Sequence, residues 1–271
     1  MALRVPLLEI HVANACNLTC ESCSHFSNSG HKGMLSLADA EAWMKSWHTR
    51  VIPGLFRMLG GEPTLNPHLP ALIELAARYW TQSRIGLTTN GFFLHRHPDL
   101  PAVLERHRVI LRLTIHHRSK EYLAKFREIV ALIDEWRKDY SFELIIENAY
   151  ERWTRRYRGF GAGVLPFRDD NPRKSWENCP AKNCMQLFRN RLWKCSPIAY
   201  LRLQKEAHPG ISRLWDRYLA YGGLGPDCSD AELLTFTQWQ DEGICGMCAM
   251  TPKPFEKPSP LIPLSVLREA A

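Results

Sequence analysis

Three cysteines near the N-terminus limit what this chain can be more than any other feature of the sequence. Cys16, Cys20 and Cys23 are spaced CxxxCxxC and are the only cysteines in the first 178 residues. Three thiolates at this spacing can hold three irons of a [4Fe-4S] cluster and leave the fourth iron without a protein ligand. Because an open iron can bind and reduce a small molecule, the motif predicts a redox-active iron–sulfur enzyme.

A second motif, Gly60-Gly61-Glu62-Pro63, directly follows a short apolar run. Together the two motifs resemble the radical S-adenosylmethionine (radical SAM) superfamily. The resemblance implies that the three cysteines carry a [4Fe-4S] cluster whose open iron binds S-adenosylmethionine (AdoMet). It implies that reductive cleavage of AdoMet gives a 5′-deoxyadenosyl radical, which removes a hydrogen atom from the substrate. It also implies that the GGEP motif contacts the amino group of AdoMet.

Composition excludes several other classes of protein. The sequence has no run of about 18 apolar residues and no signal-peptide pattern, so we expect a cytoplasmic protein with no membrane contact. Nine cysteines in such a chain indicate metal or redox chemistry before disulfides. The net charge of +7 permits an anionic partner, such as an electron donor of the flavodoxin or ferredoxin type. Because the charge is dispersed along the chain, we do not expect nucleic-acid binding.

The first half of the chain alternates apolar runs with amphipathic segments, as βα units around a parallel sheet do. Ser36 and Ser119 are predicted N-caps of two helices, and a third helix begins near Asn66. The predicted strands are residues 7–12, 54–59, 85–89, 109–115, 142–146 and, as a sixth, 163–165.

Both motifs, and several polar residues, follow the ends of predicted strands, which is the edge where parallel α/β folds bind ligands. The resemblance implies an α/β fold with a partial (β/α)6 barrel. The spacing of the segments alone would also allow a doubly wound sheet. We expect the barrel to occupy residues 1–170, a small cysteine-rich domain residues 171–250, and a proline-rich tail residues 251–271.

Five residues outside the two motifs are further candidates for the active site. By resemblance, Thr89, Asn90 and Thr114 stand where polar contacts to AdoMet are common. His116 is a candidate substrate contact or proton donor, because imidazole titrates near neutrality, although a structural histidine would also fit. Arg152, in the basic stretch at residues 152–158, could hold an anionic group of the substrate or lie on a solvated face.

The sequence departs from the family pattern just before the third cysteine. Many members of the family have an aromatic residue there, close to the adenine of AdoMet. This chain has Ser22 at that position, followed after Cys23 by Ser24, His25 and Phe26.

The remaining six cysteines all lie between residues 179 and 248. A hairpin is predicted at residues 187–195, because apolar residues flank an Arg-Asn-Arg turn and Asn tolerates positive φ. This region resembles the SPASM/twitch extensions of radical SAM enzymes, which bind an auxiliary [4Fe-4S] cluster. The resemblance implies four ligands: Cys179 or Cys184, with Cys195, Cys245 and Cys248. A structural zinc ion on four thiolates is the alternative.

The predicted reaction is the oxidation or epimerisation of a small polar substrate, sugar- or cyclitol-like. Because the first strand is predicted to begin near residue 7, we expect no leader-peptide recognition domain, which favours a small substrate. Cys228 is left over from the cluster ligands and is the candidate hydrogen-atom donor of an epimerase. One alternative is a maturase that modifies ribosomally made peptides. The other is a non-catalytic iron–sulfur module, against which the two intact motifs argue.

Overall fold

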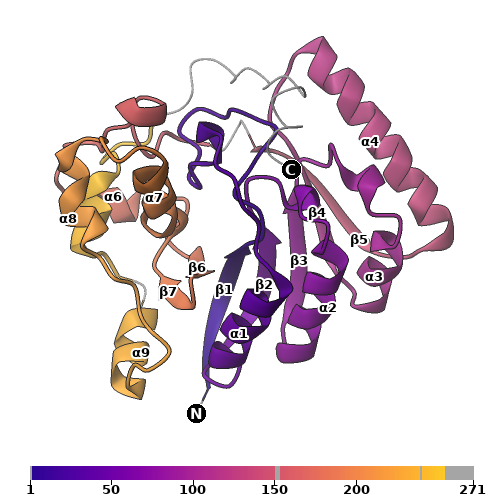
Figure 1. Ribbon diagram of the computed structural model, residues 1–271, viewed down its shortest axis with the longest axis horizontal. Coiled ribbons are helices and arrows are strands. Elements are labelled where there is room, and N and C mark those ends of the chain that lie inside the picture. Colours follow the sequence, from indigo (N-terminus) through magenta and orange to yellow (C-terminus); the bar gives the residue numbers. More distant parts are fainter. Residues whose placement is uncertain (1, 150–152, 239, 254–271) are drawn as a thin grey trace.

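The computed structural model describes all residues except 1, 150–152, 239 and 254–271. A seven-stranded sheet with the order β5-β4-β3-β2-β1-β6-β7 runs through the molecule (Figure 1). The first part of the chain alternates strands and helices: β1 (Leu3–His11), α1 (Leu37–Trp47), β2 (Val51–Leu59), α2 (Leu69–Tyr79), β3 (Arg84–Thr89), α3 (Leu100–Arg106), β4 (Ile110–Ile115), α4 (Lys120–Asp139) and β5 (Glu143–Asn148).

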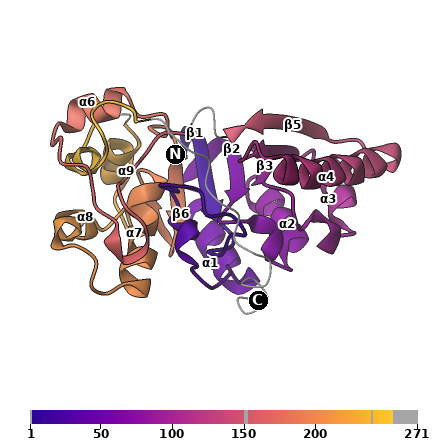
Figure 2. The ribbon, with the colours of Figure 1, turned by 90° about the horizontal axis from the view of Figure 1, so that it is seen from above.

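The α/β class predicted from the sequence is confirmed. Strands β1 to β5 pair in parallel, so their C-terminal ends lie along one edge of the sheet. Figure 2 shows α1 to α4 on a single face of this sheet, whereas a doubly wound fold would place helices on both faces. None of the helices in the described part of the chain is both long and apolar enough to cross a bilayer.

The predicted helix starts are confirmed by their capping contacts. The Ser36 side chain accepts a hydrogen bond from the backbone N–H of Asp39, and Ser119 accepts one from Tyr122, which satisfies an N–H group left free by each first turn. Strands β1 and β2 begin earlier than predicted and run through Pro6 and Pro53. Local sequence signals stop a strand at proline, because proline cannot donate a hydrogen bond.

The predicted sixth barrel strand at residues 163–165 is wrong. Gly161–Gly163 forms a 3-10 turn, and Leu165 makes only an isolated bridge to Arg158. The next strand is β6 (Met185–Phe188), which pairs in parallel with β1 at the opposite side of the five-stranded unit. The partial barrel therefore has five βα-type strands, and a later strand extends it beside β1.

A buried carboxylate holds β6 to the sheet. Glu9 in β1 is 4% exposed and lies opposite Arg57 of β2 on one side and Gln186 of β6 on the other. Glu9 Oε1 is 2.7 Å from Arg57 Nη2, and Gln186 donates a hydrogen bond to Glu9 Oε2. Since a buried carboxylate is stable only when it is paired, these contacts favour the docking of β6 next to β1.

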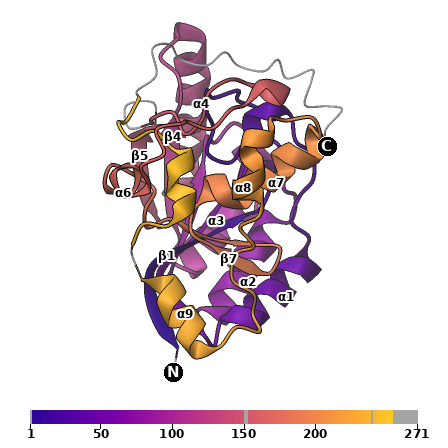
Figure 3. The ribbon, with the colours of Figure 1, turned by 90° about the vertical axis from the view of Figure 1, so that its left-hand side faces the viewer.

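The second part of the chain packs beside β1 and β6. It contains α6 (Pro172–Glu177), β7 (Arg191–Trp193), α7 (Ser196–Ala207), α8 (Asp216–Leu219) and α9 (Asp230–Thr237), which Figure 3 shows in front of the sheet. The predicted hairpin is confirmed: β6 and β7 are antiparallel, and the two turn residues, Arg189 and Asn190, have φ of 52° and 57°. From residue 254 on, the predicted tail lies outside the described residues.

Two hydrophobic clusters stabilise the fold. The first lies between the sheet and α1 to α4 and includes Trp47 and Trp80. The second lies around α7 and includes Trp193 and Trp215, but it also takes in Phe26 and Tyr157 from the first half of the chain. The boundary expected at residue 170 stays a prediction, and both the sheet and the second cluster extend across it.

Trp80 offers a test of the first cluster. Its side chain is 2% exposed, its Nε1 donates to the carbonyl of Val51 at 2.8 Å, and its ring lies 4.2 Å from that of Phe56. Trp80→Ala should lower the free energy of unfolding by about 3–5 kcal/mol in urea denaturation followed by circular dichroism. Leu234→Ala, at a side chain that is 53% exposed, should change it by less than about 0.5 kcal/mol. Equal effects would contradict the packing described.

Candidate functional site

A cavity of about 280 Å³ lies at the C-terminal edge of the parallel strands. We call it the three-cysteine cavity, because Cys16, Cys20 and Cys23 all line it. It also brings together most of the other residues predicted for this site, from the C-terminal ends of β2, β3 and β4: Gly60, Gly61, Glu62, Thr89, Asn90, Thr114 and His116. Pro63 is buried behind them, where it begins a 3-10 turn.

The two glycines of the GGEP motif allow a close approach between backbones. A Cβ atom on Gly60 would lie 2.6 Å from the carbonyl oxygen of Ala13, and one on Gly61 would lie 2.1 Å from that of Ala15. The backbone N–H groups of Gly61 and Glu62 donate to these carbonyls at 2.7 and 2.8 Å. The two glycines thus join the end of β2 closely to the segment that leads into the cysteines.

Glu62 acts as a link between loops. Its carboxylate is fully buried and accepts hydrogen bonds from the backbone and hydroxyl of Thr64, from the hydroxyl of Thr89 and from the backbone N–H of Asn90. Burial raises the pKa of Glu62, and these four hydrogen bonds oppose the shift. With its acceptors used in this way, Glu62 fixes the position of the β2 and β3 ends relative to each other.

Asn90 and His116 extend this network to the cysteines. Asn90 Nδ2 donates to Asn17 Oδ1 at 2.7 Å, next to Cys16. His116 lines the cavity, with Nε2 at 2.8 Å from Thr114 Oγ1 and Nδ1 at 3.5 Å from Cys20 Sγ. Burial lowers the pKa of His116 to about 4, so the ring is neutral at neutral pH. The next residue, His117, accepts a hydrogen bond from the backbone N–H of Ser119 and is not part of the cavity wall.

Ser22 anchors a second loop over the cysteines. Ser22 is 1% exposed and has a φ of 51°. Its Oγ accepts hydrogen bonds from the backbone N–H groups of Arg156 at 2.7 Å and Tyr157 at 2.9 Å. A bulky aromatic side chain would have neither the space nor the acceptor for this contact. The departure from the family pattern at Ser22 therefore has a structural cause, the docking of residues 153–157.

Two cavity residues in that loop were missed by the sequence analysis. Trp153 lines the cavity, and its ring lies 6.0 Å from that of His116; Arg156 lines it as well. The basic stretch at residues 152–158 predicted that this segment belongs to the site, but it did not single out Trp153 or Arg156. The residue that was predicted, Arg152, lies outside the described residues. Trp153 supplies an aromatic face in the cavity, whose wall has no aromatic residue at position 22.

The donor set of the three-cysteine cavity fits an iron–sulfur cluster. Burial has the largest effect on the three thiols and raises the pKa of each. At Cys16 and Cys20, the neighbouring cysteines raise the pKa further. Thiols in such a place become thiolates only when a metal supplies positive charge. The cavity wall also provides room next to the thiols for a small molecule.

A second, smaller cavity of about 50 Å³ lies in the C-terminal half of the chain. We call it the four-cysteine cavity, because Cys179, Cys195, Cys245 and Cys248 line it. Burial raises the pKa of Cys248 to about 12, and the charge of Arg156 opposes this shift. Of the two cysteines that the sequence left open, Cys179 is the one that lines this cavity.

Cys184 lies apart from these four. It is not in the wall of the four-cysteine cavity, and burial, followed by the carboxylate of Glu9, raises the pKa of its thiol to about 12. Its backbone carbonyl accepts a hydrogen bond from Gln186. Cys184 thus lies beside the Glu9 network and outside the wall of the four-cysteine cavity.

In the part of the chain that the structure describes, no three His, Cys, Asp or Glu side chains converge closely enough to hold one metal ion. A zinc ion needs its four ligands within about 2.0–2.3 Å. A cubane spaces its thiolates more widely, because each binds a different iron.

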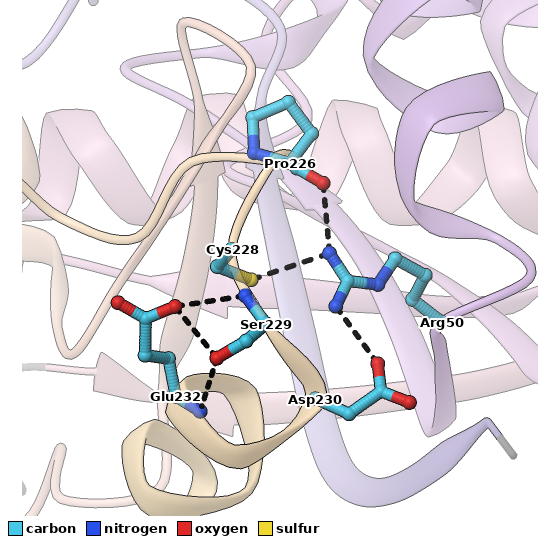
Figure 4. Close-up of polar contacts among 6 residues, drawn as sticks. All are labelled: Arg50, Pro226, Cys228, Ser229, Asp230 and Glu232. Carbon is cyan, nitrogen blue, oxygen red and sulfur yellow. Dashed lines mark hydrogen bonds and ion pairs between the residues drawn. The ribbon is translucent and has the colours of Figure 1, made fainter.

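Cys228 lines neither of the two cavities. Its Sγ accepts a hydrogen bond from Arg50 Nη1 at 3.3 Å, and Arg50 also contacts the carbonyl of Pro226 and the carboxylate of Asp230 (Figure 4). Arg50 immediately precedes β2, so this cluster lies at the N-terminal edge of the strands, opposite the three-cysteine cavity. The structure therefore does not bring the predicted hydrogen-atom donor to the site.

Comparison with known proteins identifies relatives of the first half of the chain. The model of the radical SAM superfamily matches residues 10–150. The GTP 3′,8-cyclase of Tolumonas auensis is 29% identical over 93 residues, which are 34% of this chain and 27% of that protein. The 7,8-dihydro-6-hydroxymethylpterin dimethyltransferase of Methanocaldococcus jannaschii is 36% identical over 92 residues, which are 32% of this chain and 18% of that protein. The chain thus spans about a quarter or less of these curated relatives.

The likeness to solved structures extends over almost the whole chain. The crystal structure of BtrN in complex with AdoMet and 2-DOIA aligns with a TM-score of 0.55, over 94% of this chain and 98% of that chain. The sequence identity is 16%, so the likeness concerns the fold.

Gly61 tests the close approach that shapes the three-cysteine cavity. Gly61→Ala would push a methyl group against the backbone of Ala15 and should displace the cysteine segment, so we expect loss of iron from this site and a lower melting temperature. Iron per chain and thermal unfolding measure both effects. Gly210→Ala is the matched control, because nothing lies within 4 Å of its added Cβ. Equal iron content in the two variants would contradict the proposed constraint.

Cys228 gives the opposite expectation. Cys228→Ala removes one contact of Arg50 but leaves those to Pro226 and Asp230, so iron content, AdoMet cleavage and product formation should stay at the wild-type level. Chromatography of 5′-deoxyadenosine and product measures this outcome. Normal AdoMet cleavage with loss of product would restore Cys228 as a catalytic thiol.

Proposed function

The chain belongs to the radical SAM superfamily, and from this premise we propose that it removes a hydrogen atom from a small polar, sugar- or cyclitol-like substrate, which is then oxidised or epimerised. Enzymes of this superfamily use a [4Fe-4S] cluster and AdoMet and require a reductant. When bound, the two cofactors supply a 5′-deoxyadenosyl radical that can attack an unactivated C–H bond. Cys16, Cys20 and Cys23 would hold the cluster in this chain.

The polar residues of the cavity have distinct proposed roles. Gly60, Thr89, Asn90 and Thr114 face the space next to the cysteines and would contact AdoMet, with Trp153 as an aromatic face for the adenine. Glu62 acts indirectly, by holding the ends of β2 and β3 in place. His116 would orient the thiolate of Cys20 rather than donate a proton, since it is neutral and lies against that sulfur.

The observation that carries the choice of substrate is the size and lining of the three-cysteine cavity. About 280 Å³ lies just below the range for small-molecule sites, and the wall includes polar side chains from β3, β4 and β5. The far wall contains Arg156 and Pro180, the neighbour of Cys179. The full-length likeness to BtrN, whose crystal structure contains AdoMet and 2-DOIA, supports the same substrate class.

We propose further that Cys179, Cys195, Cys245 and Cys248 hold an auxiliary [4Fe-4S] cluster, in a twitch-like domain at residues 171–250. Four protein thiolates leave no iron open, so this cluster would serve in electron transfer rather than in substrate binding. An electron donor of the flavodoxin or ferredoxin type would supply the reducing electron.

Anaerobic reconstitution tests both cluster assignments. The chain should bind about eight irons, four in each cluster, and Cys16→Ala with Cys20→Ala and Cys23→Ala should reduce this to about four and abolish AdoMet cleavage. Cys184→Ala, the control at a thiol outside both groups, should leave the iron content unchanged. Four irons with one zinc in the wild type would overturn the auxiliary cluster and spare the first.

The substrate class is tested by adding candidates together with AdoMet and a reductant. Formation of 5′-deoxyadenosine should increase with polyols, cyclitols or sugars, and the product should be two electrons more oxidised or, in D₂O, carry one deuterium after epimerisation. An increase with peptides alone would favour the maturase alternative and overturn the proposed substrate.

A further inference from the structure

Arg156 contacts both cavities. Its side chain lines the three-cysteine cavity, and its Nη1 lies 3.8 Å from the Sγ atom of Cys179, which lines the four-cysteine cavity. Its charge also lowers the pKa of Cys248, against the dominant effect of burial. One guanidinium thus stands between the two groups of thiols.

The backbone of Arg156 is held by the first of these groups. Its N–H and that of Tyr157 donate to Ser22 Oγ, directly before Cys23. The Tyr157 hydroxyl donates to the carbonyl of Cys23 at 3.1 Å, and its ring stacks on Phe26 with 4.6 Å between centroids. The main chain at residue 156 is therefore attached to the cysteine loop, while the side chain extends to Cys179.

Arg156 differs from its neighbours in its partners. Arg155 forms an ion pair with Glu21 at 2.6 Å, and the exposed Arg158 donates to the carbonyl of Pro166. Among the residues that the structure describes, no carboxylate forms an ion pair with Arg156. A guanidinium has five N–H donors, so after the contact with Cys179 it keeps capacity for an acceptor in the cavity. Within the described part of the chain, its charge is therefore not cancelled by an acidic side chain.

We propose that Arg156 couples the substrate cavity to the auxiliary site: it raises the reduction potential of a cluster held by the four cysteines and binds an acceptor oxygen of the substrate with the same guanidinium. The proposal rests on the function proposed above. A cluster with four thiolates is anionic and gains one more negative charge on reduction. A nearby cation stabilises the reduced state more than the oxidised state, because the Coulomb energy grows with the charge.

The coupling has a consequence for substrate class. A neutral hydroxyl oxygen that binds Arg156 leaves the positive charge in place, so the potential stays raised. A carboxylate or phosphate in the same position would neutralise the charge and lower the potential. The structure therefore favours a neutral polyol as the substrate of an oxidation that uses this cluster as electron acceptor.

The test measures the midpoint potential of the auxiliary cluster in the reconstituted full-length chain, by redox titration followed by electron paramagnetic resonance. AdoMet changes the spectrum of the cluster with the open iron, which allows the other signal to be assigned. Arg156→Gln should shift the auxiliary potential to a lower value, and Arg156→Lys should give an intermediate value, because it keeps the charge but loses the planar fork. Arg158→Gln, which removes an exposed charge from the same segment, should leave the potential unchanged.

The same variants test the substrate contact. With the substrate identified by 5′-deoxyadenosine formation, Arg156→Gln should raise its KM by about tenfold, as expected for one charge-assisted hydrogen bond, and leave the affinity for AdoMet unchanged. Should Arg156→Gln fail to retain iron, Arg156→Met, which also removes the charge, carries the test, and a wild-type potential together with a wild-type KM in that variant would overturn the coupling.

The outcomes separate this inference from the proposed function. If Arg156→Gln and Arg158→Gln both bind eight irons and have the same auxiliary potential, the role of Arg156 is overturned, while the proposed function is not affected. Four irons in the wild type would overturn the auxiliary cluster and with it the coupling. A shifted potential with an unchanged KM would show that Arg156 serves the cluster without touching the substrate, and would overturn the shared contact.

Discussion

The site depends on one buried carboxylate. Glu62 is inaccessible to solvent, and such a group is stable only when hydrogen-bond donors surround it. Its donors come from the turn that follows it and from the end of β3, so the ends of two neighbouring strands are held at one level. Asn90 transfers this constraint to the cysteine segment through Asn17. The positions of the thiols thus follow from hydrogen bonds as well as from their spacing in the sequence.

Local features of the fold could be predicted from the sequence, and long-range ones could not. The caps at Ser36 and Ser119 and the Arg189-Asn190 turn use atoms only a few residues apart, so the pattern of nearby residues determines them. The pairing of β6 with β1 joins Glu9 to a residue 177 positions away. No local pattern distinguishes this pairing from a sixth strand beside β5, and residues 163–165 were misassigned for that reason.

The same limit applies to the site. The motif spacing predicted the residues around Cys16, Cys20 and Cys23, because they follow the ends of adjacent parallel strands. Spacing could not show which of Cys179 and Cys184, five positions apart, lines the four-cysteine cavity, because that depends on how distant segments pack. Arg156 could not be predicted as a cavity residue either. Its position depends on a hydrogen bond to Ser22, far away in the sequence, and the basic stretch itself does not indicate which arginine makes that contact.

The second hydrophobic cluster bears on how such chains can recombine. Phe26, just beyond the third cysteine, is fully buried and shares a core with Tyr157, Trp193 and Met247. A crossover at residue 170 would keep the stacking of Phe26 on Tyr157 but would replace Trp193, Trp215 and Met247, which belong to the same cluster. A foreign C-terminal half would therefore fit this chain only if it brought its own surface for the loop that follows the third cysteine.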